Sequence, residues 1–192
     1  MAGAVILARH GEPALSRRVI LTAADYRDWW ATYECGGLRP DQAPPPELVS
    51  IARSAGCVLS STRERAVQSA RALTQGRPFC SDDLFVEAPL PSPPLPGWFR
   101  LSPRWWGVLS RLSWSAFNYH DGQETRAQAA VRAGQAADAL IARAAKGEDV
   151  MLIAHGYFNY MIGRALAVRG WRRTLDQGFK YWSARRYEPP PA

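Results

Sequence analysis

Three short runs of apolar residues set the strongest limit on the fold of this chain. They are AVILA at residues 4–8, CVLS at 57–60 and VMLIA at 150–154. Apolar runs of this length are typical of parallel strands that are buried on both faces of a sheet. Segments with helical patterns separate the runs, and strands that alternate with helices predict an α/β fold.

Helical patterns fill most of the remaining chain. We expect helices over residues 22–33, 47–54, 63–74, 123–146 and 157–168, a short Trp-rich helix at 104–117 and a weaker strand at 79–86. Six prolines fall within residues 88–103, so this segment is expected to be an irregular loop. A chain of 192 residues is the size of one domain. We place that domain at 1–187 and expect a disordered tail at 188–192.

The cysteines and the apolar segments indicate the compartment. The three cysteines are odd in number and far apart, and no Cys/His cluster occurs, so we expect neither disulfides nor a metal site. The N-terminal apolar stretch is too short for a signal peptide. No run approaches the roughly eighteen apolar residues of a membrane helix. We therefore expect a cytoplasmic protein with no membrane contact.

The net charge of +7 and the eight tryptophans raise the question of nucleic-acid binding. The arginines are spread along the chain rather than clustered. We interpret the charge as a solvated basic surface, or as a field that attracts anionic substrates. The sequence predicts no nucleic-acid partner.

Two histidines directly follow apolar runs. Arg9-His10-Gly11 ends the first predicted strand, and His155-Gly156 ends the third. Ligands of open α/β sheets bind beyond the carboxyl ends of the strands. The two imidazoles can therefore meet at one edge of the sheet although they lie far apart in the chain.

Arginines near these histidines complete a candidate phosphate pocket. Arg9 adjoins His10, and Arg63 and Arg65 open the helix after the second run. A guanidinium presents a planar fork that matches phosphate oxygens, and the start of a helix offers free N–H groups to an anion. We expect at least one of Arg63 and Arg65 to face solvent instead.

Four segments resemble motifs of the histidine phosphatase superfamily, the phosphoglycerate mutase-like proteins. They are VILARHGEP, SSTRERAVQSA, DGQETRAQAAVRA and MLIAHGYFN, which occur in the family's order and span residues 5 to about 168. The resemblance implies a three-layer α/β/α sandwich with a mostly parallel central sheet. It points to the phosphatase branch, because the chain is short of the insertions typical of glycolytic mutases.

The resemblance also implies roles for the matching residues. His10 matches the nucleophile, and Arg9, Arg65 and His155 match the other members of the phosphate pocket. Arg65 is preferred to Arg63 because it directly precedes Ala66-Val67-Gln68, and Glu87 matches the proton donor. Gly11, Glu12, Ser61 and Glu124 are candidates for the layer around the pocket. Ser61 could equally cap its helix, and Glu124 could simply complement a helix dipole.

The implied reaction is metal-independent hydrolysis of a small-molecule phosphate ester, with no cofactor. An imidazole nitrogen attacks phosphorus, and a carboxyl group protonates the leaving oxygen. The segment APLPSPPLPGWF after Glu87, and Tyr157-Phe158 after the second His-Gly, depart from the commoner family pattern. The natural substrate is therefore not implied. A phosphomutase of the same fold and a catalytically idle member that binds a phospho-ligand or a protein are the alternatives. The sequence does not predict the oligomeric state.

Overall fold

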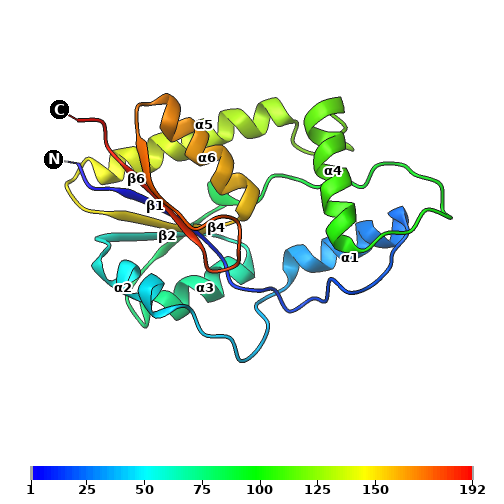
Figure 1. Cartoon of the computed structure of the whole chain (residues 1–192), viewed down its shortest axis with the longest axis horizontal. Coiled ribbons are helices and arrows are strands. Elements are labelled where there is room, and N and C mark those ends of the chain that lie inside the picture. The colour runs from blue at the N-terminus through cyan, green and yellow to red at the C-terminus, as the bar shows by residue number, and fades with distance from the viewer. Residues whose placement is uncertain (1, 192) are drawn as a thin grey trace.

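A six-stranded sheet forms the centre of the computed structural model, which describes residues 2–191 (Figure 1). The strands are β1 (Val5–Arg9), β2 (Cys57–Ser61), β3 (Cys80–Asp82), β4 (Val150–Ala154), β5 (Arg172–Asp176) and β6 (Ala184–Glu188), in the order β3-β2-β4-β1-β6-β5. The first four strands of that order are parallel, β6 is antiparallel to β1, and β5 is antiparallel to β6. The three predicted apolar runs are therefore neighbouring strands in the middle of the sheet.

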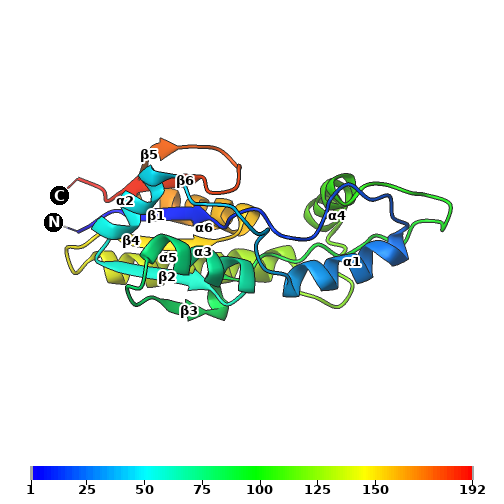
Figure 2. The ribbon, with the colours of Figure 1, turned by 90° about the horizontal axis from the view of Figure 1, so that it is seen from below.

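Helices cover both faces of the sheet (Figure 2). Helices α2 (Pro46–Ser54) and α3 (Glu64–Thr74) lie on one face, and α5 (Arg126–Ala144) and α6 (Gly156–Val168) lie on the other. Along β1, Ile6 and Ala8 pack into the first layer, whereas Val5 and Leu7 pack into the second. Both faces of the central strands are thus buried, and the predicted three-layer α/β/α sandwich is confirmed.

Two further helices lie beside the sandwich, beyond the end of the sheet where β1 finishes (Figures 1 and 2). They are α1 (Ala23–Cys35) and α4 (Pro103–Phe117). Their contact has its own core, which includes Tyr26, Trp29 and Trp106. The buried indole of Trp106 donates a hydrogen bond to the carbonyl of Leu21 at 2.8 Å. We call residues 15–35 and 95–117 the cap.

Most predicted elements lie within a few residues of the observed ones, and the capping box of Thr22 and Asp25 starts α1 as expected. The strand predicted at 79–86 is wrong in length. It ends at Asp82, whose carboxylate accepts a hydrogen bond from the N–H of Leu84 and begins a short 3-10 turn at Asp83–Phe85. No helix within residues 2–191 is both long and apolar enough to cross a membrane.

The sequence did not predict β5 and β6. All five residues of β5 are exposed, and β6 contains Arg185 and Arg186, so neither strand has an apolar run. Strand β6 ends at Glu188, the first residue of the tail expected at 188–192. The last residue of that tail, Ala192, lies outside the described residues.

Candidate active site

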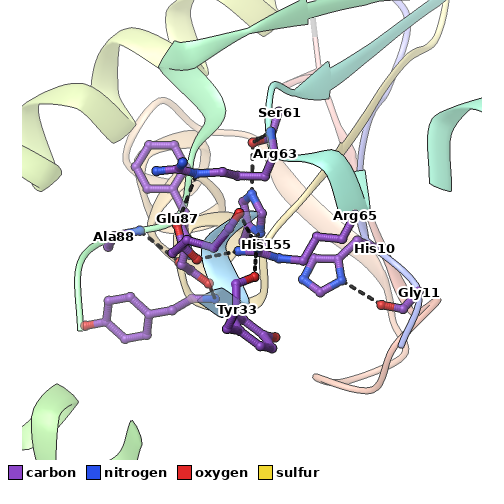
Figure 3. Close-up of polar contacts among 12 residues, drawn as sticks. His10, Gly11, Tyr33, Ser61, Arg63, Arg65, Glu87, Ala88 and His155 are labelled. Atoms are coloured by element: carbon purple, nitrogen blue, oxygen red, sulfur yellow. Dashed lines mark hydrogen bonds and ion pairs between the residues drawn. The ribbon is translucent and has the colours of Figure 1, made fainter. Parts of the chain in front are cut away.

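The ends of β1 and β4 bring the two histidines together (Figure 3). Arg9 lies opposite Ala154 in the parallel register, and the N–H of His10 donates to the carbonyl of Ala154 at 3.0 Å. The ring centroids of His10 and His155 are 5.2 Å apart, at an interplanar angle of 63°. Both side chains are buried. Neighbouring parallel strands therefore create the predicted pair of imidazoles.

The hydrogen bond of His10 determines which ring nitrogen is free. Nδ1 lies 2.7 Å from the carbonyl oxygen of Gly11. A carbonyl only accepts, so Nδ1 carries the hydrogen and Nε2 keeps its lone pair. Burial, followed by the positive charges of Arg65 and Arg9, holds the pKa of His10 well below its ordinary value of 6.5. His10 is therefore a neutral imidazole near pH 7, as a nitrogen nucleophile must be.

His155 is neutral for the same reasons. Its Nδ1 lies 3.4 Å from Nη2 of Arg65, which can only donate, and its Nε2 lies 2.9 Å from the hydroxyl of Ser61. The hydrogen is thus on Nε2, which donates to Ser61. Burial, followed by the positive charge of Arg65, lowers the pKa of His155 well below 6.5. Ser61 therefore orients the second histidine.

Arg65 reaches the pocket from the first turn of α3, and its side chain is 1% exposed. Its Nη1 donates to the carbonyls of Tyr33 and Glu34 at 3.0 and 3.2 Å, and its Nη2 donates to Glu34 Oε1 at 2.7 Å. Arg63 is the helix N-cap, and its side chain is 39% exposed. The structure thus places Arg65 beside the histidines, whereas Arg63 is partly exposed and its Nε forms an ion pair with Glu34 at 3.0 Å.

Four buried arginine nitrogens have no hydrogen-bond partner among the described residues. They are the Nε atoms of Arg9, Arg17, Arg63 and Arg65, and that of Arg63 lies in an ion pair with Glu34 at 3.0 Å. The rest of the Arg9 guanidinium is held by the carbonyl of Phe179 and by the face of the Tyr181 ring, whose centroid is 4.3 Å away. Buried polar groups are normally paired, so the unpaired Nε donors of Arg9, Arg17 and Arg65, whose residues line one cavity, provide what an anion would bind.

A cavity of about 390 Å³ connects these groups. Its lining includes the five predicted catalytic and phosphate-binding residues, Arg9, His10, Arg65, Glu87 and His155. It also includes residues outside the predicted site, among them Arg17, Trp30, Tyr33, Arg104 and Arg111. Most of these come from the cap, so the cavity lies between the cap and the end of the sheet.

Glu87 is held at the start of α6. Its Oε1 accepts hydrogen bonds from the N–H groups of Ala88 and Phe158 at 3.0 and 2.9 Å, and its Oε2 accepts from that of Tyr157 at 3.3 Å. Helix α6 begins directly after His155. The same helix start therefore positions both the carboxyl group and the second histidine.

Arg132 of α5 supports the chain on one side of Glu87. It donates to the carbonyls of Leu84 and Val86 at 3.0 and 2.8 Å, and it forms a two-bond ion pair with Glu124, with both distances at 2.7 Å. Thr125 rather than Glu124 caps α5. The contacts of Glu124 therefore place it in the layer behind the pocket, through Arg132.

Arg111 of α4 supports the chain on the other side of Glu87. It donates to the carbonyls of Ala88 and Pro89, each at 3.1 Å. Its guanidinium lies 3.9 Å from the centroid of the Tyr157 ring. Burial lowers the pKa of Arg111, and the nearby charge of Glu87 opposes this shift.

Gly11 and Glu12 follow His10 and differ in their contacts. The carbonyl of Gly11 fixes the His10 ring, and a Cβ on Gly11 would lie 2.3 Å from the Trp182 ring. Glu12 forms an ion pair with Arg39 at 3.1 Å, and its side chain is 45% exposed. Glu12 therefore points away from the imidazoles.

Within residues 2–191, no group of three or more His, Cys, Asp or Glu side chains could hold a metal ion.

The comparisons with known proteins bear on the fold. No family model and no curated protein matches the sequence. Solved structures do match, and the chain has the phosphoglycerate mutase-like fold that the sequence resemblance predicted.

The similar structures include two phosphatases and a mutase. A phosphoserine phosphatase variant from Entamoeba histolytica, in complex with phosphoserine, is 13% identical at a TM-score of 0.57, over 86% of this chain and 80% of that one. A phosphoglycerate mutase from Bacillus anthracis is 14% identical at a TM-score of 0.60, over 100% and 93% of the two chains. A mycobacterial glucosyl-3-phosphoglycerate phosphatase is 17% identical at a TM-score of 0.55, over 100% and 99%.

Proposed function

We propose that this chain is a phosphatase that hydrolyses phosphomonoesters through a phosphohistidine at His10. The observation that carries the proposal is the protonation pattern of the pocket. His10 is buried and neutral, Gly11 holds its Nδ1–H, and the lone pair of Nε2 remains free. Unpaired Nε donors of Arg9 and Arg65 belong to the same cavity. A nucleophile beside unpaired cationic donors suits attack on a phosphate.

The first step transfers the phosphoryl group to the protein. Nε2 of His10 attacks phosphorus, the bond from phosphorus to the ester oxygen breaks, and Glu87 gives its proton to that oxygen. Arg9 and Arg65 stabilise the charge on the phosphoryl oxygens. The negative charge of the substrate favours a protonated His155, which then donates to one of these oxygens.

The second step releases phosphate. A water molecule attacks phosphorus, the bond from phosphorus to Nε2 breaks, and Glu87 takes a proton from the water. The net reaction converts an ester and water into an alcohol and phosphate. Glu87 must therefore carry a proton when the substrate binds. Among residues 2–191, its Oε2 accepts a single hydrogen bond, from the N–H of Tyr157, which leaves space for that proton.

The direct test is turnover of para-nitrophenyl phosphate, with and without EDTA. We expect EDTA-insensitive turnover that falls by about 10³-fold or more in His10→Ala, and severely in His155→Ala. His120→Ala is the matched control, because His120 does not line the cavity. Denaturation in alkali after mixing with labelled substrate should trap phosphate on His10. Undiminished turnover by His10→Ala would refute the proposal.

Product analysis separates hydrolysis from phosphoryl transfer. With 3-phosphoglycerate as the probe, a phosphatase releases inorganic phosphate, whereas a mutase forms 2-phosphoglycerate, and phosphorus NMR distinguishes the two. Binding of phosphate without turnover of any ester would identify a catalytically idle phospho-ligand binder instead.

A further inference from the structure

A second and larger pocket adjoins the candidate active site. Its volume is about 810 Å³, which is within the range of pockets that hold small organic ligands. Four separate parts of the chain line it: Arg9 with residues 12–18, Arg39, Ser102 with Arg104, and residues 179–181. The two pockets share Arg9, Arg17, Arg104 and Phe179, so one ligand can extend from His10 into the second space.

The wall of the second pocket is strongly basic. Its cationic side chains are those of Arg9, Arg17, Arg18, Arg39, Arg104 and Lys180. Glu12 is the carboxylate of this wall, and it is paired with Arg39. The other five cations form no ion pair within the described part of the chain. Like charges that surround one concave space repel each other, and an anion in that space would relieve the repulsion.

Arg17 resembles Arg9 and Arg65 in having a guanidinium donor with no hydrogen-bond partner among the described residues. Its Nε is buried and has no partner among residues 2–191, and its Nη1 donates to the hydroxyl of Tyr181 at 3.3 Å. Its charge also contributes to the lowered pKa of His10. Arg17 therefore lies between the two spaces, with a donor available for an anion.

We propose that the natural substrate carries a second phosphate group, which binds in this pocket while the first phosphate reacts at His10. The inference rests on the proposed phosphatase activity. Arg9, Arg65 and His155 are enough for the reacting phosphate, and they leave Arg18, Arg104 and Lys180 without a ligand. Guanidinium groups match phosphate in geometry, and a phosphate that is nearly dianionic at pH 7 suits several cations better than a carboxylate.

The test compares monophosphates and bisphosphates of the same alkanediols, in a series of increasing chain length. For the best length, we expect kcat/KM for the bisphosphate to exceed that for the monophosphate by about tenfold or more, equivalent to about 1.4 kcal/mol of additional binding. This ratio is taken after correction for the two equivalent phosphates. A ratio near one at every length would overturn the inference.

Two double variants locate the effect. Arg18→Gln/Lys180→Gln removes two charges from the pocket and should reduce the ratio toward one. The control variant Lys146→Gln/Arg172→Gln also removes two positive charges, but at the other end of the sheet. Arg172 lies opposite Glu188 there, and Lys146 precedes β4. This control should leave the ratio of bisphosphate to monophosphate kcat/KM unchanged. A preference that survives the first variant, or that falls equally in both, would overturn the pocket assignment.

The outcomes also separate this inference from the proposed function. Turnover of monophosphates without any preference for bisphosphates would refute the second phosphate site and leave the phosphatase activity intact. No turnover of any ester, with no phosphate trapped on His10, would refute both.

Discussion

Two buried neutral histidines should make the stability of this protein depend on pH. The pKa values of His10 and His155 are both held well below 6.5, chiefly by burial. In the unfolded chain both rings are in water and bind protons below about pH 6.5. Stability is thus fully present above that pH. It is lost as the pH falls toward the folded-state pKa values, because only the unfolded state takes up protons in that window.

The size of the effect follows from proton linkage. A histidine that stays neutral when folded should lower the free energy of unfolding by about 1.4 kcal/mol between about pH 7.5 and 5.5, so the pair should lower it by about 2.7 kcal/mol. The aspartates with lowered pKa values, Asp25, Asp138 and Asp176, depart from an ordinary value of 3.8 and act at lower pH. The two histidines therefore dominate this window.

Urea unfolding, followed by tryptophan fluorescence at the two pH values, measures the loss. The difference between the two pH values within one variant cancels the direct cost of the substitution. We expect His10→Gln to reduce the loss to about 1.4 kcal/mol, and His120→Gln to leave it at about 2.7 kcal/mol. A wild-type loss below about 1 kcal/mol, or a loss unaffected by His10→Gln, would show that these rings take up protons without unfolding.

Three substitutions test the surroundings of the site. Glu87→Gln should slow the hydrolysis of alkyl phosphates more than that of para-nitrophenyl phosphate, because only the alkyl ester has a poor leaving group that needs the proton. Equal losses of steady-state rate on both esters would show that Glu87 is not the acid. Arg132→Leu removes donors that hold the Glu87 loop and should reproduce that selective loss in kcat with little change in KM, whereas a uniform loss would indicate only a structural role. Gly11→Ala should cost roughly 1–3 kcal/mol through its clash with Trp182, as read from the urea midpoint. An unchanged midpoint would show that the indole can move aside.

The central fold was predictable because its signals are local. The apolar runs at 4–8, 57–60 and 150–154 became β1, β2 and β4, since strands buried on both faces need continuous apolar residues. The strands β5 and β6 at the edge of the sheet were missed because several of their side chains are charged and neither strand has an apolar run. Arg185 is buried in β6 and pairs with Asp176 at 2.8 Å, so an ion pair replaces the apolar contact that a pattern search requires.

The chemical groups at the ends of the central strands follow directly from the amino-acid sequence. His10 and His155 follow apolar runs directly, and the register of neighbouring parallel strands then leaves little freedom in where they lie. The choice of Arg65 over Arg63 came from the family motif, and the burial of Arg65 agrees with it.

The surroundings of these groups depend instead on how distant parts of the chain pack together. The cap brings Tyr33 and Glu34 to Arg65, and Arg111 to the loop of Glu87, through contacts between residues that no sequence periodicity relates. The basic pocket likewise combines four distant segments, each with only a few arginines or lysines. A strand end is fixed by its own residues and its neighbour in the sheet. The convergence of loops depends on how the cap packs against the sandwich, and that is decided when the whole chain folds.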